Sequence, residues 1–218
     1  MTKRLFRSIG TLCLLALTSL FFSGCQTAPP SSEPPFDPDE TGFESLFDGK
    51  TFGDWKPNER AENWKIEDGA MVGRGSRSHT FYMKEEFVNF EFRAEVMINK
   101  GGNSGIYFHC AHLDEGWPSV GHEGQINNTH RDPVKTGSLW GCVKNYVPPC
   151  EDDEWFDYSI LVNGQNIVTR INGRIISDYT EAPGCEGGRK IGKGYIALQQ
   201  HDPGSVVRFR NLRIKRLP

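Results

Sequence analysis

Residues 89–98 read NFEFRAEVMI, and the pattern in this stretch decides the fold. Apolar side chains stand at every second position: Phe90, Phe92, Ala94, Val96 and Ile98. Residues two apart lie on the same face of a strand, so this face enters a core while the polar residues between them face solvent. The stretch therefore predicts a half-buried strand of an antiparallel sheet.

Shorter runs with the same period of two stand on both sides of this strand. They cover residues 64–67, 70–73, 105–110, 157–163, 167–171, 174–177, 194–200 and 206–216. Asp68-Gly69, Asn163-Gly164 and Asn172-Gly173 separate neighbouring runs, and such pairs tolerate the positive φ that tight hairpins need. Asp202-Pro203-Gly204 divides the last two runs, and we expect a turn of the same kind there.

No window after Phe43 sustains a helical period. Many short strands joined by turns indicate an all-β sandwich or barrel. A jelly-roll sandwich of two antiparallel sheets suits the length of 218 residues, although periodicity does not determine the strand order.

The beginning of the chain has the order of an export signal. Lys3, Arg4 and Arg7 precede a short apolar run over residues 12–22, which ends in Ser-Gly-Cys25. This ending resembles the lipobox of bacterial lipoproteins, in which the cysteine is acylated and becomes the new N-terminus. The resemblance implies a lipid on Cys25, and cleavage nearby by an ordinary signal route is the alternative.

Composition divides the chain into a signal over residues 1–24, a tether over 25–40 and a domain over 41–218. The tether is rich in Pro, Ser and acidic residues, so it cannot bury enough surface to order itself. Gln26 stands where Asp would resemble an inner-membrane retention signal. We therefore expect an exported protein, lipid-anchored to the periplasmic or cell-surface side of the envelope, with the outer membrane preferred.

The charge of the chain argues against a nucleic-acid partner. It has 25 basic and 28 acidic residues, and loss of the signal removes three basic ones, which leaves 22 against 28 and a net charge of −6. No basic patch stands out in the sequence. The oligomeric state is left open.

The domain contains four cysteines: Cys110, Cys142, Cys150 and Cys185. In an exported protein they most simply form two disulfide bonds, and three pairings are open. Cys142 and Cys150 bracket a loop with two prolines, which favours that pair. The spacing fits neither a zinc knuckle nor a redox CxxC motif.

Residues 101–140 hold many titratable and amide side chains beside little apolar sequence. Asn103, Tyr107, Glu123 and Gln125 are among them. Ordinary core strands do not need so many polar groups, so we expect a polar functional site in this region.

Short motifs follow one another through the whole domain. They are GFESLFDGK at 42–50 with Trp55, NSGIYF at 103–108, EGQI at 123–126, GSLWG at 137–141, GYIALQQHD at 194–202 and FRN at 209–211. In this order they resemble the bacterial 3-keto-disaccharide hydrolase domain family, long known as a domain of unknown function. The resemblance implies a concanavalin A-like jelly-roll sandwich and an enzyme that cleaves 3-keto-glycosides.

The implied substrate determines which groups the site needs. A ketone at C3 acidifies the hydrogen on C2, and the glycosidic oxygen on C1 is β to the carbonyl. Cleavage can proceed by proton abstraction at C2, an enolate and loss of the C1 oxygen, followed by addition of water. One base, groups that stabilise the enolate and an acid for the leaving oxygen are sufficient.

Glu123 is the candidate base. In Glu123-Gly124-Gln125 the two polar side chains share one face of a strand and line one groove, and a solvated strand face is the alternative reading. His201 is the second candidate catalytic residue, as acid or base, and Gln199 lies two positions before it on the same face. A histidine that precedes a turn is also often structural.

The candidates for substrate binding are Asn103, Tyr107, His109, Gln125, Trp140, Lys144, Gln199 and Arg210. Asn103 lies in a glycine-rich loop that a ligand can approach closely, and Tyr107 and His109 alternate on one strand face. Trp140 offers a flat apolar surface for a pyranose ring.

Lys144 and Arg210 carry positive charge that could stabilise an enolate. A divalent metal ion that polarises the ketone is a further candidate cofactor, with Glu123 and His201 among its ligands. No HxH or HExxH spacing supports it.

Two other functions stay open. The same sandwich occurs in non-catalytic carbohydrate-binding modules on the cell surface, and in structural or adhesive domains. Acid and base side chains in one groove favour the enzyme.

Overall fold

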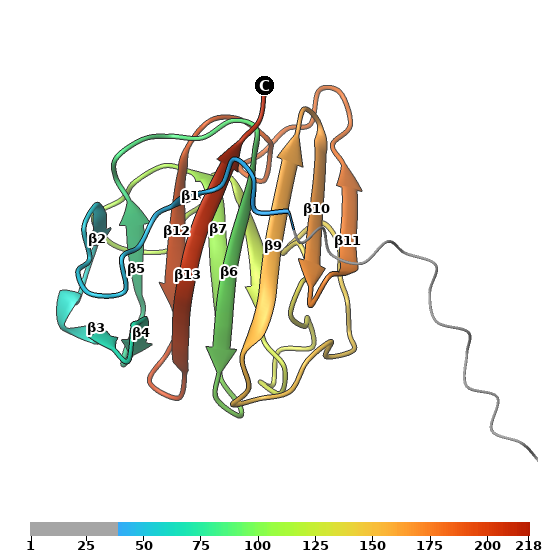
Figure 1. Ribbon diagram of the computed structural model, residues 1–218. Coiled ribbons are helices and arrows are strands. Elements are labelled where there is room, and N and C mark those ends of the chain that lie inside the picture. Colours follow the sequence, from blue (N-terminus) through green and yellow to red (C-terminus); the bar gives the residue numbers. More distant parts are fainter. Residues whose placement is uncertain (1–38) are drawn as a thin grey trace, which may run out of the picture. The chain divides into compact units, whose positions relative to one another are not determined.

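The computed structural model describes residues 39–218 and places them in two antiparallel sheets packed face to face (Figure 1). The strands are β1 (Glu44–Ser45), β2 (Trp55–Pro57), β3 (Trp64–Glu67), β4 (Ala70–Arg74), β5 (Ser78–Tyr82), β6 (Phe90–Ile98), β7 (Ser104–Cys110), β8 (His122–Ile126), β9 (Phe156–Asn163), β10 (Asn166–Ile171), β11 (Arg174–Thr180), β12 (Tyr195–Gln200) and β13 (Val206–Arg216). One 3-10 turn, η1 (Ala61–Asn63), is the helical part of these residues, and no helix within 39–218 is long and apolar enough to cross a membrane. The predicted all-β class is confirmed. The predicted signal, Cys25 and nearly all of the tether lie outside the described residues.

The larger sheet has eight strands in the order β11-β10-β9-β6-β13-β4-β3, with β1 paired to β13. The smaller sheet has five strands in the order β2-β5-β12-β7-β8. The chain repeatedly passes from one sheet to the other, as it does from β6 to β7, from β8 to β9 and from β12 to β13. This is the arrangement of a jelly-roll sandwich.

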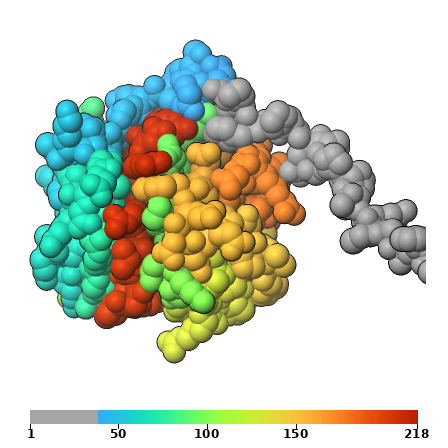
Figure 2. Space-filling model, turned by 60° about the horizontal axis from the view of Figure 1, so that its bottom comes forward, coloured from blue at the N-terminus to red at the C-terminus, as the bar shows by residue number. Residues whose placement is uncertain are grey.

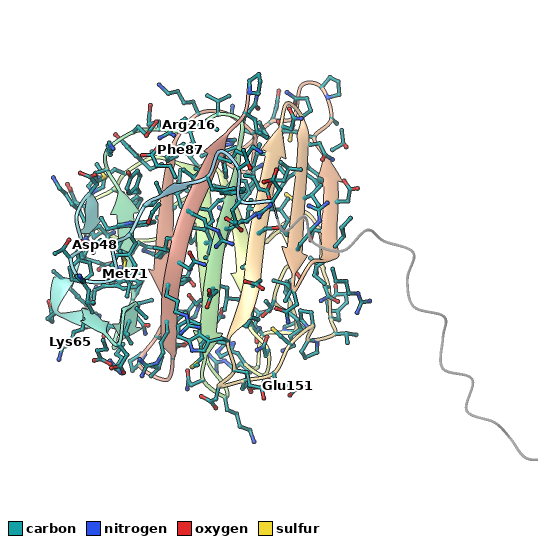
Figure 3. All side chains as sticks on the ribbon, viewed as in Figure 1. Asp48, Lys65, Met71, Phe87, Glu151 and Arg216 are labelled. Atoms are coloured by element: carbon teal, nitrogen blue, oxygen red, sulfur yellow. The ribbon has the colours of Figure 1, made fainter. Side chains whose placement is uncertain are left out.

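The core lies between the two sheets. From β6 it receives Phe90, Phe92, Ala94, Val96 and Ile98, all at most 1% exposed. The predicted alternation of this strand is therefore confirmed, and each buried phenylalanine contributes about 1.5–3 kcal/mol to folding. At one end of the sandwich the Arg216 guanidinium carbon lies 5.8 Å from the centre of the buried Phe87 ring (Figure 3).

Three of the predicted turns are hairpins. Asp68 and Gly69 have φ of 51° and 77° between β3 and β4, and Asn172 and Gly173 have φ of 50° and 81° between β10 and β11. Asn163 pairs with Asn166 where β9 turns into β10. The expectation for residues 202–204 was wrong, because β12 and β13 belong to different sheets and this turn carries the chain across the sandwich.

Strands β1, β2 and β5 were not predicted. Every residue of β5 is buried, but its sequence Ser-His-Thr-Phe-Tyr does not alternate between polar and apolar residues. Burial on its outer face comes from the loop over residues 111–121, where the ring centres of His112 and Phe81 are 5.0 Å apart. A strand with polar residues at its core-facing positions, as Ser78 and Thr80 are here, loses the period-two signal.

Loops from distant parts of the sequence meet at the end of the sandwich that Figure 2 turns toward the viewer. Asn99 donates from Nδ2 to the Gly204 carbonyl over 3.0 Å, and the Gly101 amide donates to Thr129 Oγ1 over 2.8 Å. The amide of Asn103 donates to Ser205 Oγ over 2.9 Å. These bonds fix the beginning of β7, which leads into the site described below.

The prediction of disulfide bonds is contradicted. Cys110, Cys142, Cys150 and Cys185 are all free thiols. Cys110 lies on β7, and burial raises its pKa to about 12. Cys150 lies against Asn128, to which its thiol donates over 3.4 Å, and burial also raises its pKa to about 12. Cys142 and Cys150 bracket a loop with two prolines, but they do not form a disulfide bond.

Candidate active site

The outer face of the smaller sheet collects polar side chains from three neighbouring strands. Tyr107 on β7 is in register with Glu123 on β8 and with Ala197 on β12. Gln199 on β12 is in register with His79 on β5. Because residues two apart share a face, Gln125 and Gln199 project on the same side as Glu123 and Tyr107.

These side chains open into one pocket of about 390 Å³, which we call the central pocket. It is lined by Asn103, Tyr107, Trp117, Glu123, Gln125, Asp132, Trp140, Arg189, Gln199 and His201. The two pairs expected to share a groove, Glu123 with Gln125 and Gln199 with His201, therefore line the same pocket. Strand β7 lies between β8 and β12 and forms its floor.

Glu123 is a buried carboxylate held by neutral partners. Its side chain accepts a hydrogen bond from Gln199 Nε2 over 3.2 Å at Oε1, and a second one from the Tyr107 hydroxyl. Burial raises the pKa of Glu123 from 4.5 to about 7, although these hydrogen bonds and the charge of Arg189 oppose the rise. Burial also raises the pKa of Tyr107, so its phenol stays protonated and can donate.

Two glycines, Gly105 and Gly124, leave the space that the side chains around Glu123 occupy. A Cβ on Gly105 of β7 would collide with the Glu123 carboxylate, which lies across that strand. A Cβ on Gly124 would stand 2.6 Å from the hydroxyl of Tyr158, which reaches β8 from the larger sheet and donates to the Gln125 carbonyl over 3.3 Å. The NSG and EGQ motifs therefore supply the space in which the carboxylate lies on one face and Tyr158 packs on the other.

A chain of amides continues from Gln125. Its Nε2 donates to Asn103 Oδ1 over 2.7 Å, and Asn103 Nδ2 lies 3.4 Å from His130 Nδ1. Asn103 is 3% exposed and Gln125 is 2% exposed. Buried amides that bind one another have fixed orientations, so the remaining polar atoms are presented to a ligand at defined positions.

His201 reaches the pocket just after β12 ends, and Asp202 orients its ring. His201 Nδ1 lies 2.7 Å from Asp202 Oδ2, which leaves Nε2 as the ring atom able to exchange a proton with a ligand. Burial acts against the ionised form of Asp202, but its hydrogen bonds with His201 and the Gly204 amide hold the pKa of this carboxyl below its usual value.

Aromatic and basic side chains stand at the mouth of the pocket. Trp117 and Trp140 are 43% and 42% exposed, and they come from different loops. The Trp140 amide donates to the Glu123 carbonyl over 2.9 Å, which ties this loop to β8. The guanidinium carbon of Arg189 lies 5.1 Å from the Trp140 ring centre and 5.7 Å from that of Tyr107.

Trp117, Asp132 and Arg189 line the pocket and were not predicted as site residues. Trp117 could have been found, since a tryptophan between Gly116 and Pro118 in a loop has no core to fill. Arg189 and Asp132 carry no such signal, because a charged residue in a polar loop is usually only solvated.

The structure places His109, Lys144 and Arg210 outside the central pocket, which corrects three of the predicted binding residues. His109 has φ of 54° at an irregularity of β7, so the expected alternation with Tyr107 is broken. Its ring lies 5.7 Å from that of Phe90 in the core, and its Nε2 lies 2.8 Å from the Val88 carbonyl.

Lys144 is exposed beside Val143, which packs against the core. Arg210 belongs to β13 of the larger sheet, where its Nε donates to Glu95 over 2.6 Å. An arginine on the opposite sheet cannot reach the pocket.

The donors in the pocket do not fit a metal ion. Within residues 39–218 no group of three or more His, Cys, Asp or Glu side chains is arranged to hold one. The hydrogen-bond partners of Glu123 are an amide and a phenol.

The fold is that of the concanavalin A-like jelly rolls. The crystal structure of a protein from Parabacteroides distasonis ATCC 8503, described as a putative glycosyl hydrolase, aligns with a TM-score of 0.70 and 24% identity. The alignment covers 81% of this chain and 94% of that one. The Bacillus licheniformis β-glucanase aligns with a TM-score of 0.55 and 12% identity over 83% of this chain and 100% of that one.

Residues 42–215 match the family described as the 3-keto-alpha-glucoside-1,2-lyase-like domain, and the chain belongs to that family. A curated relative, a 3-keto-disaccharide hydrolase from Bacteroides thetaiotaomicron, is 35% identical over 81 residues. This match covers 32% of the chain and 28% of the relative, so the chain corresponds to less than a third of that protein.

Proposed function

We propose that this protein cleaves 3-keto-glycosides by removing the C2 proton, with Glu123 as the base. The observation that carries the proposal is a buried carboxylate in a pocket, whose pKa is raised to about 7 and whose partners are neutral. A base of this kind is ionised in half of the molecules near neutral pH and binds a proton far more tightly than an exposed carboxylate does. The family match and the curated relative agree with the substrate class.

The proposed reaction has three steps. Glu123 takes the C2 proton, and the electron pair of the C–H bond forms an enolate with the C3 carbonyl. The enolate collapses to restore C3=O and form C1=C2, and the C1–O bond breaks with its electron pair leaving on oxygen. His201 protonates that oxygen through Nε2, and water then adds at C1 while C2 regains a proton. The net change is hydrolysis of one glycosidic bond.

The remaining side chains of the pocket have roles that follow from their charge and shape. Arg189 carries the positive charge in the described part of the pocket lining and stabilises the enolate oxygen. Gln125, Asn103 and Gln199 bind sugar hydroxyls. Trp117 and Trp140 offer flat surfaces to pyranose rings.

The experiment compares a 3-keto-disaccharide with its unoxidised parent, each incubated with the purified protein in D2O. We expect release of free sugar from the ketone alone, with deuterium at C2 of the released keto-sugar. Cleavage of the parent would indicate instead an ordinary glycosidase that uses Glu123 with Asp132, the other carboxylate lining the pocket. If free sugar is released from neither compound, the proposed enzymatic activity is refuted.

A non-catalytic carbohydrate-binding module is the second candidate function. It is favoured by the two half-exposed tryptophans at the mouth, since such surfaces bind sugars without chemistry. Tight binding of the disaccharide without release of sugar would select it.

The location of the protein is a separate proposal. We propose that the chain is exported and anchored through a lipid on Cys25, with residues 26–40 as the tether, on the basis of the sequence at residues 3–25. Detergent partitioning of the expressed chain tests it. A mature protein that stays in the aqueous phase contradicts the anchor.

A further inference from the structure

His79 on β5 is a buried histidine that the proposed chemistry does not use. It is 0% exposed, and neither ring nitrogen has a hydrogen-bond partner within residues 39–218. Burying polar nitrogen atoms without partners is costly, and native structures rarely retain such groups without a function. The position of this ring is therefore informative.

Residues that line the central pocket surround the His79 ring. Its centre lies 5.4 Å from that of Tyr107 and 5.5 Å from that of Trp117, with both rings edge-on. On the neighbouring strand it is in register with Gln199, whose Oε1 is also buried and without a partner. Two unpartnered polar groups thus lie side by side on the outer face of the smaller sheet, next to the pocket.

Trp117 is the cover over this position. It is 43% exposed, and its ring centre lies 5.1 Å from that of His201. Few contacts hold its loop at this point: the Gly116 amide donates to Glu59 over 3.2 Å, and the Arg77 guanidinium carbon lies 5.3 Å from the indole. A shift of the indole would join the surroundings of His79 to the central pocket.

We infer that His79 and Gln199 Oε1 form an inner subsite, closed by Trp117, that binds a hydroxyl group on the second sugar ring of the substrate. The inference rests on the proposed function and deepens it by assigning the leaving-group sugar to this side of the pocket, because the ring of His201, the proposed acid for the leaving oxygen, lies 5.1 Å from that of Trp117. A hydroxyl fits because it both donates and accepts: it gives its proton to Gln199 Oε1 and accepts from the ring N–H of His79.

The charge of the site agrees with a neutral ligand. Burial lowers the pKa of His79 to about 3, so the imidazole is uncharged near neutral pH and offers one donor and one acceptor. Arg77, which lies over Trp117, is already paired with Glu59 over 2.8 Å, so its charge is compensated. A phosphate or a carboxylate is therefore a poor match for this position, and a sugar hydroxyl is a good one.

The test uses His79→Phe, which keeps a flat ring of similar size and removes both nitrogens. Two substrates are compared: the 3-keto form of an α-glucosyl disaccharide, and 3-keto methyl α-glucoside, which lacks the second ring. We expect KM for the disaccharide to rise about tenfold and KM for the methyl glycoside to stay unchanged, with kcat little affected. The melting temperature should stay level or rise, because unpartnered buried atoms are removed.

Thr80→Val is the matched control. Thr80 is the next residue of β5, is 0% exposed and has an unpartnered buried hydroxyl, but it faces the opposite side of the strand. It should leave both KM values unchanged. If His79→Phe also leaves both unchanged, or raises both equally, the inner subsite is refuted and the ring only fills space.

A binding readout keeps this inference separate from the proposed function. If wild-type protein cleaves neither ketone, tryptophan fluorescence is titrated with maltose and with methyl α-glucoside. About tenfold weaker binding of maltose by His79→Phe, with methyl α-glucoside unaffected, supports the subsite. Equal affinity of both proteins for maltose, or no binding by the wild type, overturns it.

Discussion

The outer faces of the two sheets carry the same three residue types and use them in opposite ways. On the larger sheet, Arg210 binds Glu95 over 2.6 Å while its guanidinium carbon lies 4.0 Å from the Trp155 ring centre. On the smaller sheet, Arg189 lies over Trp140 and donates from Nη1 to the Gly121 carbonyl over 3.2 Å rather than to Glu123. The carboxylate is instead held by Gln199 and Tyr107.

This difference shows what makes a carboxylate a base. A half-exposed carboxylate that is paired with arginine has its charge satisfied, and such pairs add little to stability. A buried carboxylate with neutral partners keeps its affinity for a proton, because burial penalises the ionised form. Sequence position on a strand does not separate Glu95 from Glu123, whereas the partner and the burial do.

The largest effect is expected from changing the two carboxylates. Glu123→Gln should lower kcat for the 3-keto-disaccharide by about 10³-fold, the usual contribution of a positioned base. Glu95→Gln, on the other sheet, should cleave at the wild-type rate. Sugar release under saturating substrate measures both, and comparable rates for wild type and Glu123→Gln would remove the role of Glu123 while sparing the family assignment.

The next effect concerns stability and pH. The pKa of Glu123 is raised in the folded state, from 4.5 to about 7, so the folded chain binds this proton more tightly than the unfolded chain. Its contribution is therefore most favourable below pH 4.5 and is lost as the pH rises through 7, by about 3 kcal/mol in total.

Urea unfolding at pH 4 and pH 8 measures this change. The stability of wild type relative to Glu123→Gln should fall between the two pH values by that amount. If the free energy of unfolding changes with pH equally in the two proteins, the pKa of Glu123 is not raised in the folded state.

A smaller effect is expected from the two tryptophans that lie under arginines. Trp140→Ala should raise KM for the 3-keto-disaccharide about tenfold, because a stacking surface for the sugar ring is removed. Trp155→Ala removes the corresponding ring on the larger sheet and should leave KM unchanged. Equal KM values for both variants and wild type would exclude Trp140 from sugar binding.

The smallest effect is a shift of the pH profile. Arg189 lowers the pKa of Glu123 through its charge, so Arg189→Gln should raise that pKa, by up to about one unit. The base must be ionised to act, and the rising limb of kcat/KM against pH should move to higher pH. Arg210→Gln, whose charge lies on the larger sheet, should not move that limb.

Much of the fold could be predicted from local sequence. The alternation at Phe90–Ile98, the hairpin pairs such as Asn172-Gly173, and the shared face of Glu123 and Gln125 each depend on neighbours in the chain. Where apolar residues fill the core face of a strand and polar residues fill most of the other, as in β6, the period of two can be detected. Strand β5 lacks this pattern, because Ser78 and Thr80 occupy core-facing positions, and His79 was therefore not predicted as a strand residue.

The sequence by itself determined the all-β class and two pairs of residues that line the pocket, Glu123 with Gln125 and Gln199 with His201. Only the tertiary structure decided which polar groups meet: that Gln199 reaches Glu123, that Arg210 belongs to the other sheet, that His109 turns into the core at an irregular strand, and that the four cysteines stay apart. The physical reason is the distance along the chain over which each effect acts. Periodicity and turn chemistry act over a few residues, whereas burial, pKa and hydrogen-bond partners depend on segments that lie together only after the sandwich has formed.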